Sequence, residues 1–541
     1  MLKTGLLILT RPASAIYKDF NKILSHATKI VSSTLYVHIQ PISPNEVNST
    51  KRHFQIKAVP PDSEIQKLVS KLYFQSAGLC NGLDIRIFLG HLTNNHGPTP
   101  PFPLKNGYQV ILVDQPQWVS ESYDCRAEII SNVKASFPTA GEPRLEVMEL
   151  DTYEPESTPS VVSHHGPSAP LQTYDNVILG GTFDRLHMGH KLILSQACLL
   201  ANRRLVVGVT AENMHTKKVL HELIEDIAKR KGNVLNFLED VKPGLKFEVV
   251  PIHDVNGPTD YDPDLQCLVL SQETIKGGPM INSLRKDKGL SVLAEYVVDL
   301  ISDECHSQFE EEKISSSSLR KRALGTLINP VEPKPNLPTR PYLIGLCGGI
   351  GSGKSSICQR LEKLGAGTVD CDKLGHQVYV KGAHGYDKIV EEFGQDILGV
   401  DGEIDRKVLG AVVFNDKGKL QRLNHIVWPE VQKLALQQAE KLHQEGKDVI
   451  VLEAALLLEA GWKEKLHEVW TVVVPEGEAV TRIMERNKLS REEASKRVNN
   501  QMSNVERVSL SNVVLCALWE YDYTQTQVER AWTLLKKRMA L

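Results

Sequence analysis

A glycine-rich loop at residues 348–355 constrains the fold of this chain more than any other stretch. It reads GlyGlyIleGlySerGlyLysSer and follows an apolar run at 342–347 that is typical of a buried strand. Glycines allow turns that a Cβ would block, so successive backbone N–H groups converge on phosphate oxygens at the start of the next helix. Lys354 is expected to reach the β- and γ-phosphates of a nucleotide, and Ser355 to bind its Mg²⁺. A glycine-rich turn without a ligand is the alternative, which the amphipathic helix behind the loop disfavours.

Length and composition limit the other possibilities. A chain of 541 residues is too long for one hydrophobic core and predicts about three or four domains. It has 63 basic and 66 acidic residues without a long basic run, so we do not expect nucleic acid as a partner. The 9 cysteines form no CxxC pair, which favours free thiols in a reducing compartment and disfavours a structural zinc. No apolar run reaches the ~18 residues that a membrane-spanning helix needs.

Two proline-containing stretches divide the chain. Residues 151–171 are rich in Pro, Ser, Thr and Gly, prolines recur through residues 329–341, and both stretches are predicted to be linkers. They separate an N-terminal region at 34–150 from α/β units at 172–328 and 342–541. Strands alternate with helices in both units, which predicts parallel sheets with ligands beyond the carboxyl ends of the strands. The predicted fold class is α/β, with two parallel-sheet nucleotide-binding domains after an α/β N-terminal region.

The N-terminal region at 34–150 shows strands and helices in mixed order. The expected elements are strands at 35–39, 84–89, 108–114 and 145–150, a helix at 63–75 and a loop at 94–103. No nucleophile with a base and no phosphate loop stands out among them. A structural or interactive role is therefore the default, and the region is left without an assigned chemistry.

The first 33 residues allow two interpretations. Up to residue 45 the chain carries five basic residues but only one acid, Asp19, and apolar residues recur at helical spacing from Ile16 to Ile30. This combination is typical of a mitochondrial targeting helix or a surface anchor. An ordinary first helix that packs on its own domain shows the same periodicity. On the first interpretation we expect the protein in the cytoplasm and at mitochondria, either in the matrix or peripherally associated with the outer membrane.

The middle unit begins with a strand at 176–180 that leads into GlyGlyThrPheAspArgLeuHisMetGlyHis at 180–190. His187 and His190 stand at the start of the following helix, where they can donate to developing negative charge together with the helix N-terminus. Adenylyl transfer by direct attack of a phosphate oxygen on the α-phosphorus of ATP needs only such positioning and charge stabilisation. Taken alone, the histidine pair is a weak pattern that also fits a plain helix start.

Three segments in order resemble the nucleotidyltransferase superfamily with a T/HxGH signature, and within it phosphopantetheine adenylyltransferase. They are GTFDxxHxGH, two lysines at 217–218 and IleSerSerSerSerLeuArg at 314–320. The resemblance implies a Rossmann-like fold in which Thr182 and Lys217 position the phosphopantetheine phosphate and His190 stabilises the ATP phosphates. The implied catalytic residues are His187, His190 and Lys217, and the implied ATP-binding residues are Gly181, Thr182, Ser316, Ser317, Ser318 and Arg320.

One segment of the middle unit departs from the bacterial pattern. Bacterial members have an ArgGlyLeuArg-like segment where this chain has SerGlnGluThrIleLysGlyGly at 271–278. The departure suits the eukaryotic and archaeal branch of the family. Lys276 is the candidate for the basic contact to the substrate nucleotide.

The last unit contains ThrValAspCysAspLysLeuGly at 368–375, after its predicted second strand. A carboxylate there can accept the proton of a hydroxyl that attacks the γ-phosphate, or it can hold Mg²⁺ through water or cap the next helix. Together with the glycine-rich loop and motifs at 401–406 and 423–429, this segment resembles dephospho-coenzyme A kinase over essentially the whole unit. The resemblance implies that Asp372 is the base for the ribose 3′-hydroxyl and that a helical lid closes over ATP.

The same resemblance implies a set of site residues in the last unit. Lys354 and Asp372 are catalytic, Asp372 and Arg406 bind the substrate, and Ser355 binds Mg²⁺ through ATP. The implied ATP-binding residues are Gly348, Gly349, Ile350, Gly351, Ser352, Gly353, Lys354, Ser355, Ser356, Arg486 and Arg507. Trp428 and the Ala454–Ala455 pair depart from the family pattern without removing a catalytic group.

The two resemblances, in this order in one chain, imply the last two steps of coenzyme A synthesis. AMP is transferred from ATP to 4′-phosphopantetheine, and the ribose 3′-hydroxyl of the resulting dephospho-coenzyme A is then phosphorylated. We expect ATP and Mg²⁺ as cofactors, small-molecule substrates as partners, and a monomer or small oligomer. Two alternatives stay open: one unit is a non-catalytic scaffold, or the pair acts on other nucleotides.

Overall fold

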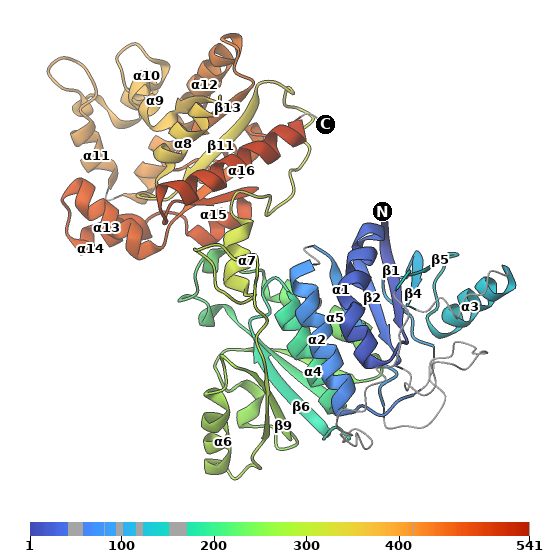
Figure 1. The fold of residues 1–541 in the computed structure, drawn as a ribbon. Helices are drawn as coiled ribbons and strands as arrows, with labels where there is room; N and C mark the ends of the chain where they lie inside the picture. The colour runs from blue at the N-terminus through green and yellow to red at the C-terminus, as the bar shows by residue number, and fades with distance from the viewer. Residues whose placement is uncertain are drawn as a thin grey trace. The chain divides into compact units, whose positions relative to one another are not determined.

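The computed structural model describes residues 1–41, 58–79, 82–93, 101–114, 123–150, 170–414 and 416–539. In these residues it contains three five-stranded sheets, and all neighbouring strands within each sheet run parallel (Figure 1). The chain divides into two compact units, Met1–Leu319 with two of the sheets and Arg320–Leu541 with the third. The α/β class predicted from the sequence is confirmed.

The first sheet has the strand order β3-β2-β1-β4-β5. Its elements are β1 (Leu2–Leu9), α1 (Ala13–Ile30), β2 (Val31–Ile39), α2 (Ser63–Leu79), β3 (Asp84–Phe88), β4 (Val110–Val113), α3 (Tyr123–Ser136) and β5 (Arg144–Val147). Apolar residues of α1 and α2 pack on one face of the sheet, and those of α3 pack on the other. The expected strands and the helix at 63–75 are confirmed, whereas most of the loop at 94–103 and of the linker at 151–171 lies outside the described residues.

The first 33 residues are an integral part of this sheet. β1 is the central strand and pairs with both β2 and β4. The apolar side of α1 is inside the core, where Ile16, Phe20 and Ile23 are all 0% exposed. The structure therefore matches the interpretation of an ordinary first helix, because a core and a membrane surface require the same apolar periodicity. Mitochondrial localisation stays a prediction. Within the described part of the chain, no helix combines the length and apolarity that a bilayer crossing requires.

The second sheet has the order β10-β9-β6-β7-β8 and forms the middle domain. Its elements are β6 (Tyr174–Gly181), α4 (Met188–Leu200), β7 (Ala201–Thr210), α5 (Ile227–Val241), β8 (Lys246–Ile252), β9 (Cys267–Ser271), α6 (Gly277–Asp287), β10 (Ala294–Val298) and α7 (Ser316–Ala323). Residues of α4 and α5 cover one face, and α6 contributes to the other. The strand order reverses at β6, so ligands are expected at its carboxyl end, beside Gly181.

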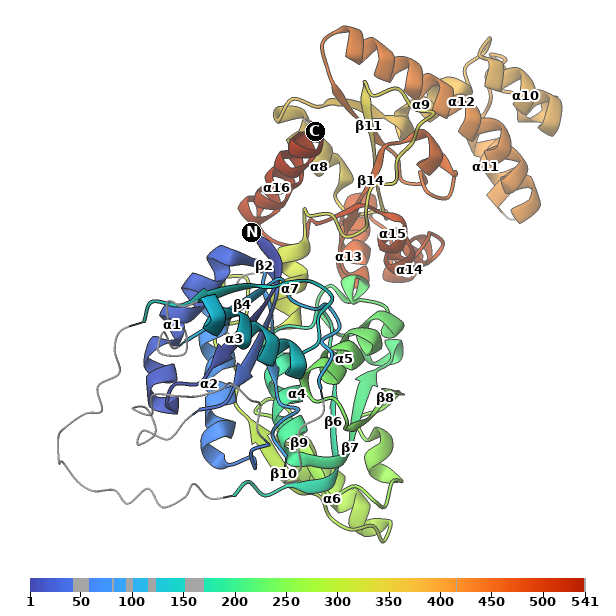
Figure 2. The same cartoon turned by 90° about the vertical axis from the view of Figure 1, so that its right-hand side faces the viewer.

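The first two sheets share one core. A single apolar cluster contains residues of α1, α2, α4 and α5 and of strands from both sheets. Figures 1 and 2 show α2 of the N-terminal domain (residues 1–150) side by side with α4 of the middle domain. The regions predicted at 34–150 and 172–328 are thus packed together, because α4 is apolar on more sides than its own sheet covers.

The third sheet has the order β12-β13-β11-β14-β15. Its elements are β11 (Tyr342–Gly348), α8 (Lys354–Lys363), β12 (Gly367–Asp370), α9 (Cys371–Val378), α10 (His384–Phe393), α11 (Arg406–Phe414), α12 (Lys417–Gln444), β13 (Val449–Glu453), β14 (Glu468–Val473), α13 (Glu476–Asn487), α14 (Arg491–Asn499), α15 (Asn504–Leu510), β15 (Val513–Cys516) and α16 (Tyr521–Met539). One face is covered by α8 and α16, the other by α9 to α12. The strand order reverses at β11, which leads into the glycine-rich loop.

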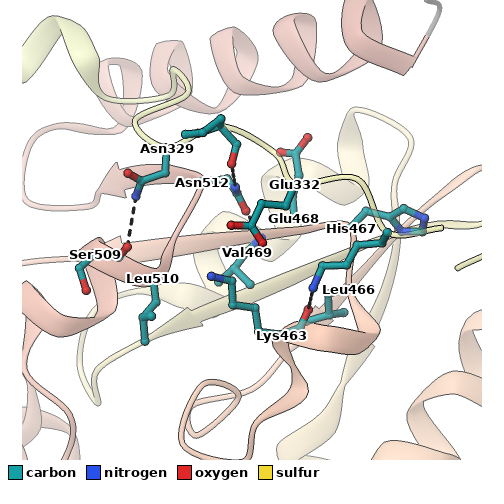
Figure 3. Close-up of a pocket in the computed structure, with 12 residues that line it drawn as sticks. Asn329, Glu332, Lys463, Leu466, His467, Glu468, Val469, Ser509, Leu510 and Asn512 are labelled. Atoms are coloured by element: carbon teal, nitrogen blue, oxygen red, sulfur yellow. Dashed lines mark hydrogen bonds between the residues drawn. The ribbon is translucent and has the colours of Figure 1, made fainter. Parts of the chain in front are cut away.

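The proline-containing segment at 329–341 lies against the third sheet. Asn329 Nδ2 donates to the carbonyl of Ser511 at 2.7 Å, and Asn512 Nδ2 donates to the carbonyl of Pro330 at 3.0 Å. A cavity of about 210 Å³ lies between this segment and β14, lined among others by Lys463 (Figure 3). Proline removes N–H donors but leaves carbonyls and flanking side chains free to bond. The segment is therefore part of the second unit rather than a free spacer.

Candidate active sites

The turn after β6 has a strained backbone at the carboxyl end of the second sheet. Phe183 and Arg185 have φ values of 51° and 50°, in the left-handed region that residues with a Cβ rarely adopt. Between them, buried Asp184 accepts a hydrogen bond from Glu225 N at 3.0 Å, and its carbonyl accepts one from Ser316 Oγ at 2.8 Å. These bonds hold the turn and bring Ser316, from the predicted ATP-binding segment, beside it.

The two predicted catalytic histidines lie together at the start of α4. The rings of His187 and His190 stack with centroids 3.7 Å apart and planes at 22°, and His187 N donates to His190 Nδ1 at 3.4 Å. Burial, and then the nearby Lys218 amine, lowers the pKa of His190 to about 3. Burial, and then the neighbouring His190, lowers the pKa of His187 well below its usual value. Both imidazoles are neutral at pH 7, so each offers an N–H donor to a phosphate without a buried charge of its own.

Of the two lysines at 217–218, the second, Lys218, lies beside Thr182. Lys218 Nζ donates to Thr182 Oγ1 at 2.6 Å, and Lys218 also lowers the pKa of His190, after the larger effect of burial. Lys217, which the sequence resemblance favoured, is exposed. The Lys217–Lys218 pair has no periodic signal that distinguishes its members, so the sequence alone did not show that Lys218 is the one that reaches Thr182; the role of Lys217 stays a prediction.

Sequence reasoning missed the buried residues that bond to the ends of β6 and β7 at this site. Arg230 on α5 is 1% exposed and donates from Nη1 to the carbonyls of Thr182 and Thr210, at 2.8 and 3.0 Å. His215 Nε2 lies 2.9 Å from Thr210 Oγ1. These contacts tie the ends of β6 and β7 to α5. An arginine inside an amphipathic helix has no motif that marks it, so only the fold reveals its role.

The remaining predicted residues of the middle domain are less tightly joined to this centre. Ser318 is buried and its Oγ accepts bonds from Ser315 Oγ and Glu311 N, both at 3.1 Å, so it stabilises its own turn. Arg320 is buried on α7, and Lys276 is exposed at the residue before α6. The structure thus brings Gly181, Thr182, His187, His190 and Ser316 to one edge of the sheet, while the nucleotide contact of Lys276 stays a prediction.

The glycine-rich loop after β11 has the backbone of a phosphate-binding loop. Gly348 and Gly351 have φ values of 151° and 79°. A Cβ at Gly348 would meet the Val472 carbonyl oxygen at 2.5 Å, so no larger residue fits without a backbone shift. Lys354 Nζ donates to the Gly348 carbonyl at 3.0 Å. Burial lowers the pKa of Lys354 while Asp372 and Glu453 act against it, so the amine is held next to negative charge inside the site.

Ser355 has a carboxylate partner that sequence reasoning missed. Its Oγ donates to Glu453 Oε1 at 2.7 Å, and Glu453 is the last residue of β13, the strand beside β11. The signal was available in the sequence, where an acid directly follows the apolar run at 449–452. Hydroxyl and carboxylate oxygens are the ligands that Mg²⁺ prefers, so these two residues fit a nucleotide-bound Mg²⁺ directly or through water.

Asp372 lies in the first turn of α9, and Arg406 is the first residue of α11. Asp372 is exposed in the first turn, and Asp370 caps the helix by accepting from Lys373 N at 3.0 Å. Arg406 Nη1 lies 2.8 Å from Nδ1 of His376, which is four residues after Asp372 and hence on the same helix face. Arg406 therefore contacts the helix that carries Asp372, one turn after that residue, and the cap role falls to Asp370 and leaves Asp372 available for chemistry.

Arg507 lies against the phosphate-binding loop, as the resemblance implied. It is 2% exposed, its Nη2 donates to Glu459 Oε1 at 3.3 Å, and a Cβ on Gly349 would come within 3.4 Å of its Nη1. Ile350 of the loop packs on the small apolar cluster of α13 and α14, and α13 carries Arg486 of the predicted lid. The loop and the lid are thus in direct contact.

A second arginine contacts the loop from α13, and it is Arg482 rather than the predicted Arg486. Arg482 on α13 donates from Nη1 to the Gly351 carbonyl at 3.3 Å and from Nη2 to the Ala517 carbonyl at 2.7 Å. Arg486, one turn later, is exposed and donates to Asn487 Oδ1 at 2.9 Å. Both arginines have the i, i+4 spacing of one helix face, so the sequence alone did not show which one reaches the loop.

Comparison with known proteins finds three family matches along the chain. Family models match residues 3–132 as COASY N-terminal domain, 178–322 as cytidylyltransferase-like and 342–517 as dephospho-CoA kinase. The dephospho-CoA kinase of Carboxydothermus hydrogenoformans is 40% identical over 195 residues, which make up 36% of this chain and 93% of the relative. The chain belongs to the dephospho-CoA kinase family.

Other members of the dephospho-CoA kinase family give the same picture. The enzyme of Geobacter sulfurreducens is 39% identical over 190 residues, 35% of this chain and 96% of its own. A solved structure of dephospho-CoA kinase from Campylobacter jejuni is also similar, with 26% identity over 36% of this chain and 97% of its own and a TM-score of 0.29. The three domain types in one chain match a bifunctional coenzyme A synthase, so the two predicted family resemblances are confirmed.

Proposed function

We propose that this chain catalyses the last two steps of coenzyme A synthesis. In the first step, ATP and 4′-phosphopantetheine give dephospho-coenzyme A and pyrophosphate. In the second, ATP phosphorylates the ribose 3′-hydroxyl of dephospho-coenzyme A. The observation that carries the proposal is the kinase domain, which matches a dephospho-CoA kinase over 93% of that relative's length. In the sequence it follows a nucleotidyltransferase-type domain that can make this kinase's substrate.

The middle domain supports the first reaction through positioning and charge. The attacking phosphate of phosphopantetheine lies beside Lys218 and Thr182, which are already hydrogen-bonded at 2.6 Å. The neutral imidazoles of His187 and His190 donate hydrogen bonds to the triphosphate of ATP. The N-terminus of α4 also stabilises the negative charge that develops as pyrophosphate leaves. No covalent intermediate is required, because the phosphate oxygen attacks the α-phosphorus directly.

The kinase domain supports the second reaction with a base and with cations. Asp372 accepts the proton of the ribose 3′-hydroxyl, and Arg406 of α11, which contacts His376 on α9, binds the substrate. The phosphate-binding loop with Lys354 holds the ATP phosphates, and Arg507 and Arg482 neutralise the transferred group. Ser355 and Glu453 would hold the Mg²⁺ of Mg-ATP, which would supply charge neutralisation at the phosphates.

The test is product analysis on variants that remove one site at a time. Wild type with 4′-phosphopantetheine and Mg-ATP should form coenzyme A, and His190→Ala should form none but should still phosphorylate added dephospho-coenzyme A. Lys354→Ala should stop at dephospho-coenzyme A. Replacing ATP by CTP tests the other reading of the cytidylyltransferase-like match, and product formation with CTP alone would overturn the first-step assignment. Loss of both reactions in either variant would contradict two separate sites.

A further inference from the structure

The helix that carries the catalytic histidine pair is enclosed by two domains. From Lys191 to Leu200, every residue of α4 except Ile193 is buried. One side of the helix faces its own sheet, and the other faces α2 and β3 of the N-terminal domain. A helix that is buried nearly all round cannot move without moving both neighbours. The N-terminal domain therefore packs directly against the helix that begins with the histidine pair of the adenylyltransferase site.

The polar residues of α4 on this side all bond to the N-terminal domain. Ser195 Oγ lies 3.1 Å from Tyr73 Oη on α2, and Gln196 Nε2 donates to Ser70 Oγ at 2.9 Å. Lys191, four residues before Ser195, donates from Nζ to Asp84 Oδ1 on β3 at 2.5 Å. Lys191 directly follows His190, so the first turn of α4 is anchored at the position next to the catalytic pair.

Asp84 belongs to a charged network that continues on the middle domain. Its second oxygen, Oδ2, accepts from Arg86 Nε at 2.9 Å, and Arg86 forms an ion pair with Asp240 of α5. Asp240 in turn accepts from Tyr36 Oη at 3.0 Å. The network alternates between the domains, with Asp84, Arg86 and Tyr36 on one side and Lys191 and Asp240 on the other. Burial lowers the pKa of Lys191, and the Asp84 carboxylate acts against this effect.

We propose that Asp84 of the N-terminal domain is a positioning residue for adenylyl transfer, which holds the first turn of α4 through Lys191 and so fixes His187 and His190. This inference rests on the first reaction of the proposed function. Lys191 is 6% exposed, and without Asp84 its amine would be a buried charge that lost its carboxylate. Either the amine moves toward water or it loses its proton, and both shift the turn that begins with His187. A misplacement of about 1 Å in a catalytic group can reduce a rate about 10²-fold.

A merely structural role for Asp84 makes a different prediction, and the chain offers a matched control. Asp19 is also a buried carboxylate of the N-terminal domain, but it lies on α1 and pairs with Arg11 rather than with a residue of α4. If buried ion pairs only stabilise the domain, Asp19→Asn and Asp84→Asn should affect activity alike. If Asp84 positions α4, only Asp84→Asn should change the first reaction.

The experiment compares full-length wild type with Asp84→Asn, Lys191→Met and Asp19→Asn. The rate of dephospho-coenzyme A formation is measured by mass spectrometry, and phosphorylation of added dephospho-coenzyme A on the same sample gives the fraction of folded kinase domain. Asp84→Asn and Lys191→Met should each lower kcat of the first reaction about tenfold or more, with KM for both substrates within about twofold, because the histidines act on the transition state. Asp19→Asn should keep kcat.

Other outcomes overturn the inference or the function separately. An unchanged kcat in Asp84→Asn, or the same loss in Asp19→Asn, would reduce Asp84 to a structural residue. Should Asp84→Asn be insoluble, Lys191→Met decides alone, since methionine fills the lysine site without leaving a charge on α4. Absence of dephospho-coenzyme A with wild type would instead refute the proposed first reaction.

Discussion

Asp372→Asn should slow the kinase reaction while leaving its substrates bound. Asparagine keeps the shape of the side chain but cannot accept the hydroxyl proton. General-base assistance contributes about 10²–10⁴-fold in rate, or about 3–5 kcal/mol of barrier, so kcat should fall by that factor. Because Asp372 is exposed and Asp370 rather than Asp372 caps α9, the helix should stay intact and KM should change little. The assay is initial-rate phosphorylation of dephospho-coenzyme A with ATP varied at saturating substrate.

Asp370→Asn is the control for this prediction. It lies two residues away, and its Oδ1 accepts from Lys373 N at 3.0 Å, a role that asparagine performs as well. Its kcat should stay within about twofold of wild type, since the N-cap bond is retained. If Asp372→Asn instead raised KM for Mg-ATP and spared kcat, the carboxylate would be a metal ligand, and the base assignment would be refuted. Adenylyl transfer on the same samples should be unaffected in both variants.

Three further predictions follow from contacts in the two units. Lys218→Ala should raise KM for phosphopantetheine about tenfold or more, as expected for loss of a charged phosphate contact, whereas Lys217→Ala should not; equal effects in a steady-state assay would contradict the register. Arg482→Ala should slow the kinase reaction more than Arg486→Ala, and the reverse order of kcat would restore Arg486 as the lid cation. Burial lowers the pKa of His38 to about 4. Because the His38 imidazole is protonated at a higher pH in the unfolded chain than in the folded one, opening of β2 should become easier by about 1.6 kcal/mol from pH 6.5 to pH 5. Hydrogen exchange of β2 in wild type and His38→Gln measures this, and identical slopes would argue against it.

The parts of the fold that the sequence predicted are those with local signals. The loop at 348–355 is set by glycines whose φ values no other residue adopts easily, and the turn at 180–190 leads from a strand into a helix. The alternation of strands and helices was enough for the parallel sheets. β1 was missed because its basic flanks resemble a targeting segment, although Leu6 to Leu9 are nearly fully buried.

The parts that the sequence did not show depend on distant neighbours. No pattern in α4 shows which of its apolar sides faces another domain, and the shared core becomes visible only when α2 is placed beside it. Glu453 and Arg482 contact the loop from elements that lie about 100 residues or more further along the sequence. The choice of Lys218 over Lys217 depends on the turn that precedes them. Each is a tertiary contact, for which neither periodicity nor propensity supplies information.

The nucleotide balance of the whole reaction tests the central claim most directly. Wild type is incubated with 4′-phosphopantetheine and Mg-ATP, and all nucleotide and thiol products are quantified by mass spectrometry over time. If the two sites work in sequence, dephospho-coenzyme A should appear before coenzyme A, and each coenzyme A formed should be matched by one pyrophosphate and one ADP. Coenzyme A that appears without pyrophosphate, or a chain that converts only added dephospho-coenzyme A, would contradict the account of two active sites in one protein.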